Sequence, residues 1–377
     1  MVSLTTRSSD HTDWNVLYDD ILVLNLGEGV ELVAYADDLA VIVTARTGEE
    51  VTSRANLVLE RIRVEMEQLG LQIVPEKTEA VLLCTRRNTQ TLRLRVADTD
   101  FETSPHLKYL GVWIDTNMRG VVHLRKTVEK AEKISLKLSR LMPNVRGPGA
   151  GKRKILASVV QSVVLYAAPA WEEVLRHKKY KGMLDRCLRR ATLRVCSAYR
   201  TCSNAAAQVI SGIPPAHLLV AERSRGYHTG DKDEAKTWME DKWQEEWEAN
   251  TETAQWTKRL IPDVRRWKNR TFGEVNFHLT QFLTGHGVFG SYLHRFRLYD
   301  SDICWFCDKA DSPEHTMFEC DRWEDERRRL SACLGADLTA DNFCPMMLAS
   351  KENWGTVTAF ATTIMKSKEQ HQRDMGR

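Results

Sequence analysis

The sequence predicts an α+β protein: a small strand-containing region near the N-terminus, then a mostly helical part with a small metal-binding region near its end. Three observations lead to this prediction. β-Branched runs fill residues 29–44, apolar residues recur at helical spacing over 51–69 and 124–141, and cysteine and histidine residues cluster between 304 and 320. A chain of 377 residues with 42% hydrophobic content is long enough for two or three domains with a buried core.

The first expected element is a β-hairpin over residues 29–44. Two apolar runs, 29–35 and 39–44, flank Ala36, Asp37 and Asp38. Adjacent carboxylates at such a turn repel each other, and a divalent cation is their usual partner. Asp37 and Asp38 are therefore candidate catalytic residues and Mg²⁺ ligands, although acidic pairs are also ordinary in solvated turns.

The next elements complete a two-layer α+β domain. Apolar residues at helical spacing predict an amphipathic helix over 51–69, and Gly70 stands where a C-cap belongs. We expect strands over 71–74 and 80–84, and a further strand over 107–114 that is interrupted at Gly111. A helix packed on strands in this order is typical of an α+β domain.

A strongly basic stretch follows. Between Arg119 and Arg200 there are 20 lysines and arginines against 5 acidic residues, although the whole chain carries a net charge of only +3. Such a bias is typical of a nucleic-acid-binding surface, and a solvated helical surface is the alternative. Helical spacing places one group of basic residues on a single face: Lys126, Lys130, Lys133, Lys137 and Arg140.

Further helices are expected downstream. The pattern predicts helices over 153–168 and 179–199, the second of which is rich in arginine. Residues 213–300 are a helical, Trp-rich connection in which Met239, Trp243 and Trp247 recur every four residues. This spacing favours packing inside the protein over stacking on nucleic-acid bases.

The cysteines indicate a metal site. Nine cysteines in a chain without an export signal favour reduced thiols and metal binding over disulfides. The spacing Cys304-x2-Cys307-x7-His315-x4-Cys320 fits a closed, tetrahedral zinc site. The neighbouring Trp305, Phe306 and Arg322 suit a nucleic-acid knuckle, while a purely structural zinc site and a chance set of core cysteines are the alternatives.

The sequence lacks two signals that would direct the protein to a membrane or out of the cell. No apolar run approaches the length of a membrane span, and the first residues lack the apolar core of a secretory signal. The sequence therefore predicts no membrane partner and an intracellular protein, cytoplasmic or nuclear. Residues 151–154 (GKRK) could form a nuclear address, but three basic residues are a weak signal.

Several of these segments resemble the reverse transcriptase, a Pol-type protein, of arthropod non-LTR retrotransposons. The run LVAYADDLAVIVTAR resembles the catalytic hairpin of that family, and LGLQIVPEKTEAVLL and LKYLGVWID resemble its next two motifs in the same order. Residues 14–22 resemble the end of its template-contacting motif. The run LTQFLTGHGVFGSYLHRF, followed by the Cys/His cluster, is similar to its C-terminal region.

The resemblance implies a function and assigns roles. It implies an RNA-directed DNA polymerase that transfers nucleotides by a two-metal mechanism, with Asp37 and Asp38 holding Mg²⁺ and Lys77 protonating the departing pyrophosphate. It also implies that Tyr109 and Gly111 contact the primer end, while the basic face from Lys126 to Arg140 lies along the template and primer. The implied partners are an RNA template, a DNA primer or target and, if the chain is active, dNTPs.

The resemblance also implies how the chain is divided. The expected parts are a divergent segment (1–13), a partial polymerase palm (14–117), a basic helical thumb-like region (118–212), the helical connection (213–300), the zinc-binding motif (301–325) and a helical tail (326–377). The family's two-metal site needs a further aspartate from an upstream strand, for which the residues before Asp37 leave no room. We therefore expect a C-terminal portion of a reverse transcriptase that does not polymerise alone.

Two other outcomes remain open from the sequence. The chain could be a non-enzymatic, zinc-dependent nucleic-acid-binding remnant in which the palm is only a scaffold. It could also be a product that does not fold stably, because missing palm strands would leave the edge over residues 30–43 exposed. Such an edge would favour self-association.

Overall fold

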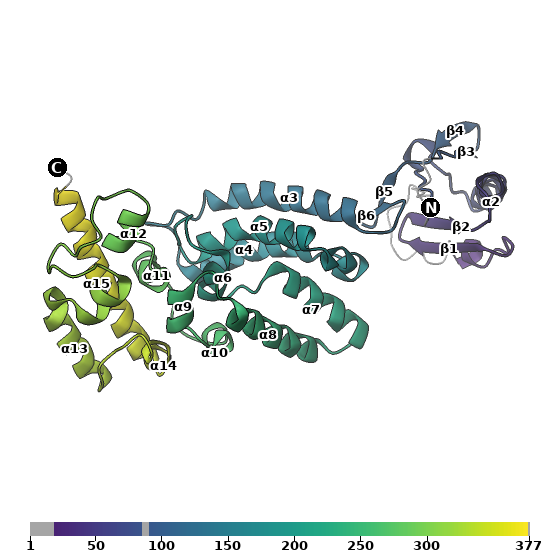
Figure 1. Cartoon of the computed structure of the whole chain (residues 1–377). Helices are drawn as coiled ribbons and strands as arrows, with labels where there is room; N and C mark the ends of the chain where they lie inside the picture. Colours follow the sequence, from purple (N-terminus) through teal and green to yellow (C-terminus); the bar gives the residue numbers. More distant parts are fainter. Residues whose placement is uncertain (1–18, 85–89, 376–377) are drawn as a thin grey trace. The chain divides into compact units, whose positions relative to one another are not determined.

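The computed structural model describes residues 19–84 and 90–375, and it divides into two compact units, Met1–Lys126 and Thr127–Arg377 (Figure 1). The expected divergent segment (1–13) and the first part of the template-contacting motif (14–18) lie outside the described residues. The described part mixes helices and strands, as the sequence predicted. None of its helices has the length and apolarity that a membrane crossing requires.

The predicted acidic hairpin is confirmed in the first unit. Strands β1 (Val30–Tyr35) and β2 (Asp38–Val43) pair antiparallel, with Tyr35 opposite Asp38. The chain reverses through two residues, and Ala36 adopts a left-handed φ of 51°. This turn places Asp37 and Asp38 at the tip of a regular two-stranded ladder.

The predicted amphipathic helix is also confirmed, as α2 (Gly48–Gln68). The Thr47 side chain caps its start by accepting a hydrogen bond from the Glu50 N–H at 3.2 Å, and Gly70 follows its end with a left-handed φ of 74°. One face of α2 packs on the acidic hairpin and buries a shared set of apolar side chains: Leu39, Val41, Val58, Leu59, Ile62 and Met66.

The prediction of one interrupted strand over 107–114 was wrong. The segment forms a second hairpin, β5 (His106–Tyr109) and β6 (Val112–Asp115), with Tyr109 opposite Val112. Leu110 and Gly111 both adopt positive φ, 43° and 83°, which suits a two-residue turn between antiparallel strands. Gly111 therefore reverses the chain instead of interrupting a continuous strand.

The strands predicted over 71–74 and 80–84 do not form either. Pro75–Lys77 is a short 3₁₀ helix (η1), and Val81 makes only an isolated bridge to Ser104. An apolar run buries side chains without becoming a strand when no neighbour supplies consecutive ladder bonds. The remaining hairpin of this unit, β3 (Arg93–Val96) and β4 (Thr99–Glu102), was not predicted.

The second unit is helical. The basic helix predicted after residue 118 is α3, which begins in the first unit, and the helices predicted over 153–168 and 179–199 are α4 and α5, each ending a few residues early. The α-helices are α3 (Val121–Ser139), α4 (Ala150–Leu165), α5 (Lys178–Val195), α6 (Asn204–Ser211), α7 (Ala216–Thr229), α8 (Lys232–Ala249), α9 (Gln255–Leu260), α10 (Val264–Lys268), α11 (Phe277–Thr284), α12 (Gly290–Arg295), α13 (Glu324–Leu334), α14 (Phe343–Met347) and α15 (Lys351–Met375).

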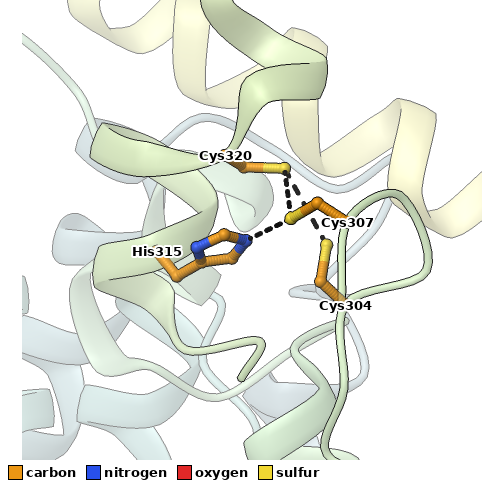
Figure 2. Close-up of side chains that lie close together, drawn as sticks. All are labelled: Cys304, Cys307, His315 and Cys320. Atoms are coloured by element: carbon orange, nitrogen blue, oxygen red, sulfur yellow. Dashed lines mark hydrogen bonds between the residues drawn. The ribbon is translucent and has the colours of Figure 1, made fainter. Parts of the chain in front are cut away.

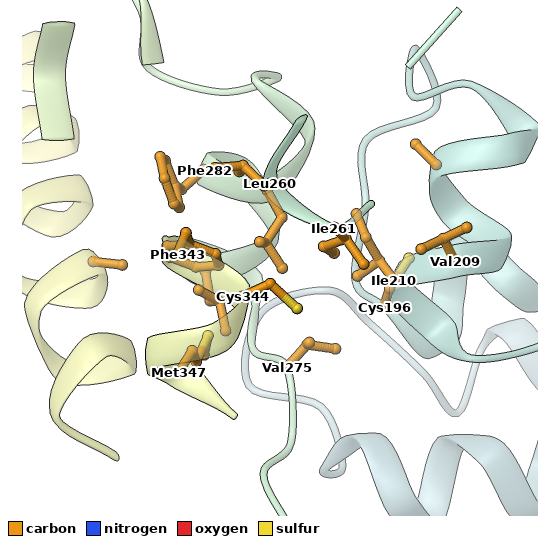
Figure 3. Packing of buried hydrophobic residues seen from close by; sticks show 14 of the residues in the cluster. Cys196, Val209, Ile210, Leu260, Ile261, Val275, Phe282, Phe343, Cys344 and Met347 are labelled. Carbon is orange, nitrogen blue, oxygen red and sulfur yellow. The ribbon is translucent and has the colours of Figure 1, made fainter. Parts of the chain in front are cut away.

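One hydrophobic core runs from the end of α5 to α15. Figure 3 shows apolar side chains from α6, α9, α11 and α14 packed together in this core. Cys304 and Cys320 belong to the same core. The packing predicted for Met239, Trp243 and Trp247 is confirmed, since each is at most 3% exposed. The helical connection, the Cys/His segment and the C-terminal helices therefore share one interior.

Arg153 is held inside this unit. Its guanidinium donates hydrogen bonds to the backbone oxygens of Pro143 (2.6 Å), Pro148 (2.6 Å), Arg194 (2.7 Å) and Met142 (3.4 Å). Only 3% of the residue is exposed, so the GKRK run is not a freely accessible basic peptide. The buried guanidinium therefore ties α4 to the end of α5.

A charged histidine joins α5, α7 and α8. His217 Nε2 lies 2.9 Å from Glu246, and its Nδ1 lies 3.8 Å from Asp185. Burial lowers the pKa of His217, but the two carboxylates outweigh it and raise that pKa from 6.5 to about 9. The protonated imidazole is therefore the form that the fold stabilises.

Stability should fall as the pH rises past this histidine's titration range. The contribution of His217 is complete below pH 6.5 and is lost by about pH 9, because the folded state binds the proton more tightly. We expect a loss of at most about 3 kcal/mol over this window. Denaturant unfolding at several pH values checks it, with His228→Gln as control; an equal pH slope in His217→Gln and the unaltered chain would contradict it.

Candidate functional site

The four predicted zinc ligands converge on one point. Cys304 and Cys307 lie on a loop closed by the Cys304 N–H to Lys309 C=O bond (2.8 Å), while His315 opens a π-helical turn (His315–Glu319) that Cys320 follows. Their ligand atoms all lie within 4.8 Å of one another. Figure 2 shows the three sulfurs and the imidazole pointing inward from these two segments.

The spacing of these atoms fits a tetrahedral zinc ion. The Sγ atoms of Cys304 and Cys307 each lie 3.8 Å from that of Cys320. Two sulfurs bonded to tetrahedral zinc at ~2.3 Å would be separated by about 3.8 Å. Cys307 Sγ and His315 Nε2 are closer, at 3.1 Å. Three thiols and one imidazole form a closed donor set that can hold zinc.

The surroundings of the cluster also suit a metal. Nδ1 of His315 is buried and has no hydrogen-bond partner among the described residues, and it lies 3.6 Å from a carboxylate oxygen of Glu319. This arrangement leaves Nε2 to face the sulfurs. Burial raises the pKa of the Cys320 thiol to about 12. A bound cation would offset this cost by stabilising the thiolate.

We call residues 304–309 the zinc loop. Its aromatic residues pack against side chains from other parts of the chain. The Trp305 ring lies 5.8 Å from Tyr299 and 5.6 Å from His371 of α15, and the Phe306 ring lies 5.5 Å from Trp323. Rings with such neighbours are poorly placed to stack on bases. Of the two roles that the sequence left open, this packing favours the structural zinc site over the knuckle.

A buried ion pair beside the zinc loop was not anticipated from the sequence. Lys368 of α15 is 1% exposed and Asp311 is 0% exposed, with Nζ 2.7 and 2.6 Å from the two carboxylate oxygens. The Thr316 hydroxyl and the Gly290 N–H, both at 2.7 Å, donate to the same carboxylate. In the sequence, a lysine in a polar helix and an aspartate in a loop give no sign of this pairing.

The acidic pair at the hairpin tip lies in a different environment. Asp37 and Asp38 are half-buried, and no third metal-binding side chain joins them in a cluster within residues 19–84 and 90–375. Tyr109 is within electrostatic reach: burial raises the pKa of its phenol, and the charge of Asp38 adds to that rise. The two hairpins thus bring together residues 71 positions apart.

The remaining residues assigned by resemblance are more scattered. Gly111 forms the turn beside Tyr109, whose hydroxyl is buried and has no hydrogen-bond partner among the described residues. Lys77 is exposed at the end of η1, and its side chain makes no hydrogen bond or ion pair with the described residues. The structure therefore associates Tyr109 with the acidic pair and gives no such link for Lys77.

The basic face of α3 is exposed along its length. Lys133 pairs with Glu129 at 2.6 Å, and the Lys126 ammonium lies 5.5 Å from the Trp113 ring centre. The opposite face of the helix is buried through Leu124, Val128 and Ala131. The predicted residues therefore point to solvent, and all five are exposed: Lys126, Lys130, Lys133, Lys137 and Arg140.

Comparison with known proteins finds similar chains in insects. The retrovirus-related Pol polyprotein from type-1 retrotransposable element R1 2 of Nasonia vitripennis is 25% identical over 390 aligned residues, covering 96% of this chain and 95% of that protein. The corresponding R1 4 protein of the same species is 21% identical and also covered to 95%. This chain is a relative of retrotransposon Pol-type proteins.

The extent of this relationship differs between relatives. A putative 115 kDa protein in type-1 retrotransposable element R1DM of Drosophila melanogaster is 26% identical over 341 residues, which cover 83% of this chain but only 33% of that protein. No family model and no solved structure matches the chain. The predicted relationship to non-LTR retrotransposon Pol proteins is confirmed, while the reverse-transcriptase palm rests on the motifs alone.

Proposed function

We propose that the chain is the C-terminal portion of a retrotransposon reverse transcriptase and that it binds nucleic acid through the basic face of α3. The exposure of that face carries the proposal, because solvated lysines on one side of a helix can follow a phosphate backbone. Its partners are an RNA template and a DNA primer or target. A chain with these partners acts in the cytoplasm, the nucleus or both.

Zinc has a structural role in this proposal. Cys304, Cys307, His315 and Cys320 hold Zn²⁺ and thereby connect the loop after α12 to the turn before α13. The donor set is closed and leaves no position for a substrate, which supports a structural ion over a catalytic one. The nucleic-acid-binding surface on α3 is then separate from the metal in sequence and in chemistry.

RNA-directed DNA synthesis is the second candidate function. The turn that presents Asp37 and Asp38, with Tyr109 in electrostatic reach of Asp38, favours it. Mg²⁺ held by the two carboxylates would supply the Lewis-acid chemistry of nucleotidyl transfer. Because residues 19–84 and 90–375 add no third ligand, we propose that polymerisation needs a carboxylate from a different polypeptide, one that is absent from the purified chain.

One experiment addresses both candidates. The zinc-loaded chain should bind a labelled primed RNA template, and its log Kd should depend steeply on log salt. Replacing four lysines of the α3 face by glutamine should reduce that slope by about 3, at ~0.7 per lost phosphate contact. In the same samples, Mg²⁺ and dNTPs should give no primer extension. The variant is Lys126→Gln, Lys130→Gln, Lys133→Gln and Lys137→Gln.

The controls separate the two functions. A matched variant removes four exposed lysines elsewhere and should keep the slope of the unaltered chain; equal slopes for all three proteins would refute binding through α3. Extension that disappears in Asp37→Ala/Asp38→Ala would overturn the proposed inactivity and establish the polymerase. The matched substitutions are Lys232→Gln, Lys236→Gln, Lys351→Gln and Lys366→Gln.

A further inference from the structure

A second basic feature lies entirely within the helical unit. A cavity of about 780 Å³ opens between α5, the end of α3 and the segment that follows α5. Five arginines line it, and its lining includes no aspartate or glutamate. They are Arg186, Arg189, Arg190, Arg194 and Arg200. We call this feature the arginine cleft.

The concentration of positive charge in the cleft points to an anionic ligand. Like charges held together repel one another, and no carboxylate in the lining relieves them. Arginine is also the cation whose planar guanidinium binds phosphate oxygens through two parallel N–H bonds. A group made only of arginines therefore suits phosphate better than it suits a diffuse acidic surface.

Two of the arginines are positioned by the fold. Arg189 donates to the backbone oxygens of Arg200 and Cys202 at 2.9 and 2.5 Å. Arg194 donates to the side-chain oxygen of Asn144 at 3.1 Å. None of these three bonds is to a carboxylate, so they restrict the positions of the two guanidinium groups without pairing them with an anion.

The other three arginines are available to a ligand. Arg186, Arg190 and Arg200 are exposed, and their side chains form no hydrogen bond or ion pair with the described residues. Arg186 and Arg194 are eight residues apart on α5, which separates them by about 12 Å along the helix axis. The row is long enough to meet more than one phosphate of a chain.

The motif LTQFLTGHGVFGSYLHRF contributes one residue to the lining of the cleft. Tyr292 lines the cleft, and its hydroxyl lies 2.9 Å from that of Thr201. Thr201 also lies 2.9 Å from His286 Nδ1, while Arg295 is 3.3 Å from His286 Nε2. Burial and the charge of Arg295 lower the pKa of His286 to about 4, so its ring is neutral near pH 7. The motif thus contributes the Tyr292 side chain to the cleft, and Thr201 and His286 hold that side chain in place.

We propose that the arginine cleft, with Tyr292 in its lining, binds the phosphodiester backbone of one nucleic-acid strand. This inference rests on the proposed function, because both need nucleic acid as the ligand, and it adds a site separate from the lysines of α3. Recognition through the backbone implies that single-stranded RNA and DNA both bind.

The test removes charge only where the fold does not depend on it. Arg186→Gln/Arg190→Gln/Arg200→Gln should melt like the unaltered chain, because these side chains are exposed and form no hydrogen bond or ion pair with the described residues. Its affinity for short single-stranded RNA and DNA should fall about tenfold or more, and its salt slope should drop by about 2. A matched variant removes three exposed arginines outside the cleft: Arg223→Gln, Arg329→Gln and Arg373→Gln.

The outcomes distinguish this inference from the function on which it rests. If the unaltered chain binds and both triple variants bind equally well, the cleft assignment fails while the α3 proposal stands. If the unaltered chain binds neither RNA nor DNA, the proposed function fails and the cleft assignment fails with it. A loss confined to the cleft variant supports the assignment.

Discussion

Removing zinc is expected to destabilise the whole helical core around the Cys/His loop. Cys304 and Cys320 are 6% and 0% exposed and belong to the same hydrophobic cluster as Phe282 and Phe343. Without metal, three thiols and an imidazole would face one another in this interior with few partners. Because metal binding to such sites contributes about 10 kcal/mol or more in small zinc domains, we expect a loss of several kcal/mol here.

Metal content and thermal unfolding measured together test this prediction. The chain should contain one zinc per molecule, and a chelator should lower its melting temperature. Cys320→Ser should abolish zinc retention, whereas Cys333→Ser should change neither property, because Cys333 is exposed and lies outside the cluster. Zinc retention by the Cys320→Ser protein, or a chelated sample that melts unchanged, would contradict the proposed site.

Replacing Lys368 by methionine is expected to cost about 3–5 kcal/mol of folding free energy, because it leaves the Asp311 carboxylate buried without its cation. The pair is enclosed on all sides: Lys368 Nζ also lies 5.6 Å from the ring centres of Phe289 and Trp305. Thr316, 3.0 Å from the ammonium, cannot replace the missing charge. Denaturant unfolding of the zinc-loaded protein measures the loss.

A control on the same helix separates charge burial from helix content. Lys366→Met changes the same residue type two positions away, at an exposed site, and should alter stability by less than about 0.5 kcal/mol. The double variant Asp311→Asn/Lys368→Met should be more stable than the two single losses predict, because neither charge is then left alone. Equal effects of Lys368→Met and Lys366→Met would show that the pair contributes nothing.

These two features act on the same short segment. The ion pair fixes Asp311, which lies between Cys307 and His315, and Thr316 follows the histidine directly. Zinc held by the cluster would join the ends of this segment, and Lys368 ties its middle to α15. The C-terminal helix therefore supports the metal ligands, and loss of the ion pair should weaken zinc retention as well as stability.

The local patterns in the sequence were read correctly where short-range rules apply. The hairpin around Asp37 and Asp38, the helix that ends before Gly70 and the exposed basic face of α3 depend on residues close together in the chain. The Cys/His cluster was found for the same reason, since the spacing of its four residues is itself the signal. Predictions failed over 71–84 and 107–114, where the outcome depended on which segments could pair.

What the sequence determined by itself is therefore the locally encoded elements and the chemical inventory: acidic turn, basic helix, Cys/His set and the relationship to retrotransposon Pol proteins. Only the tertiary structure decided that Cys304 and Cys320 lie inside a shared core, that Lys368 pairs with Asp311, and that Tyr292 lines one cleft with the arginines of α5. The reason is physical. Periodicity and spacing record contacts between near neighbours, whereas buried charges and clefts are made by residues that only folding brings together.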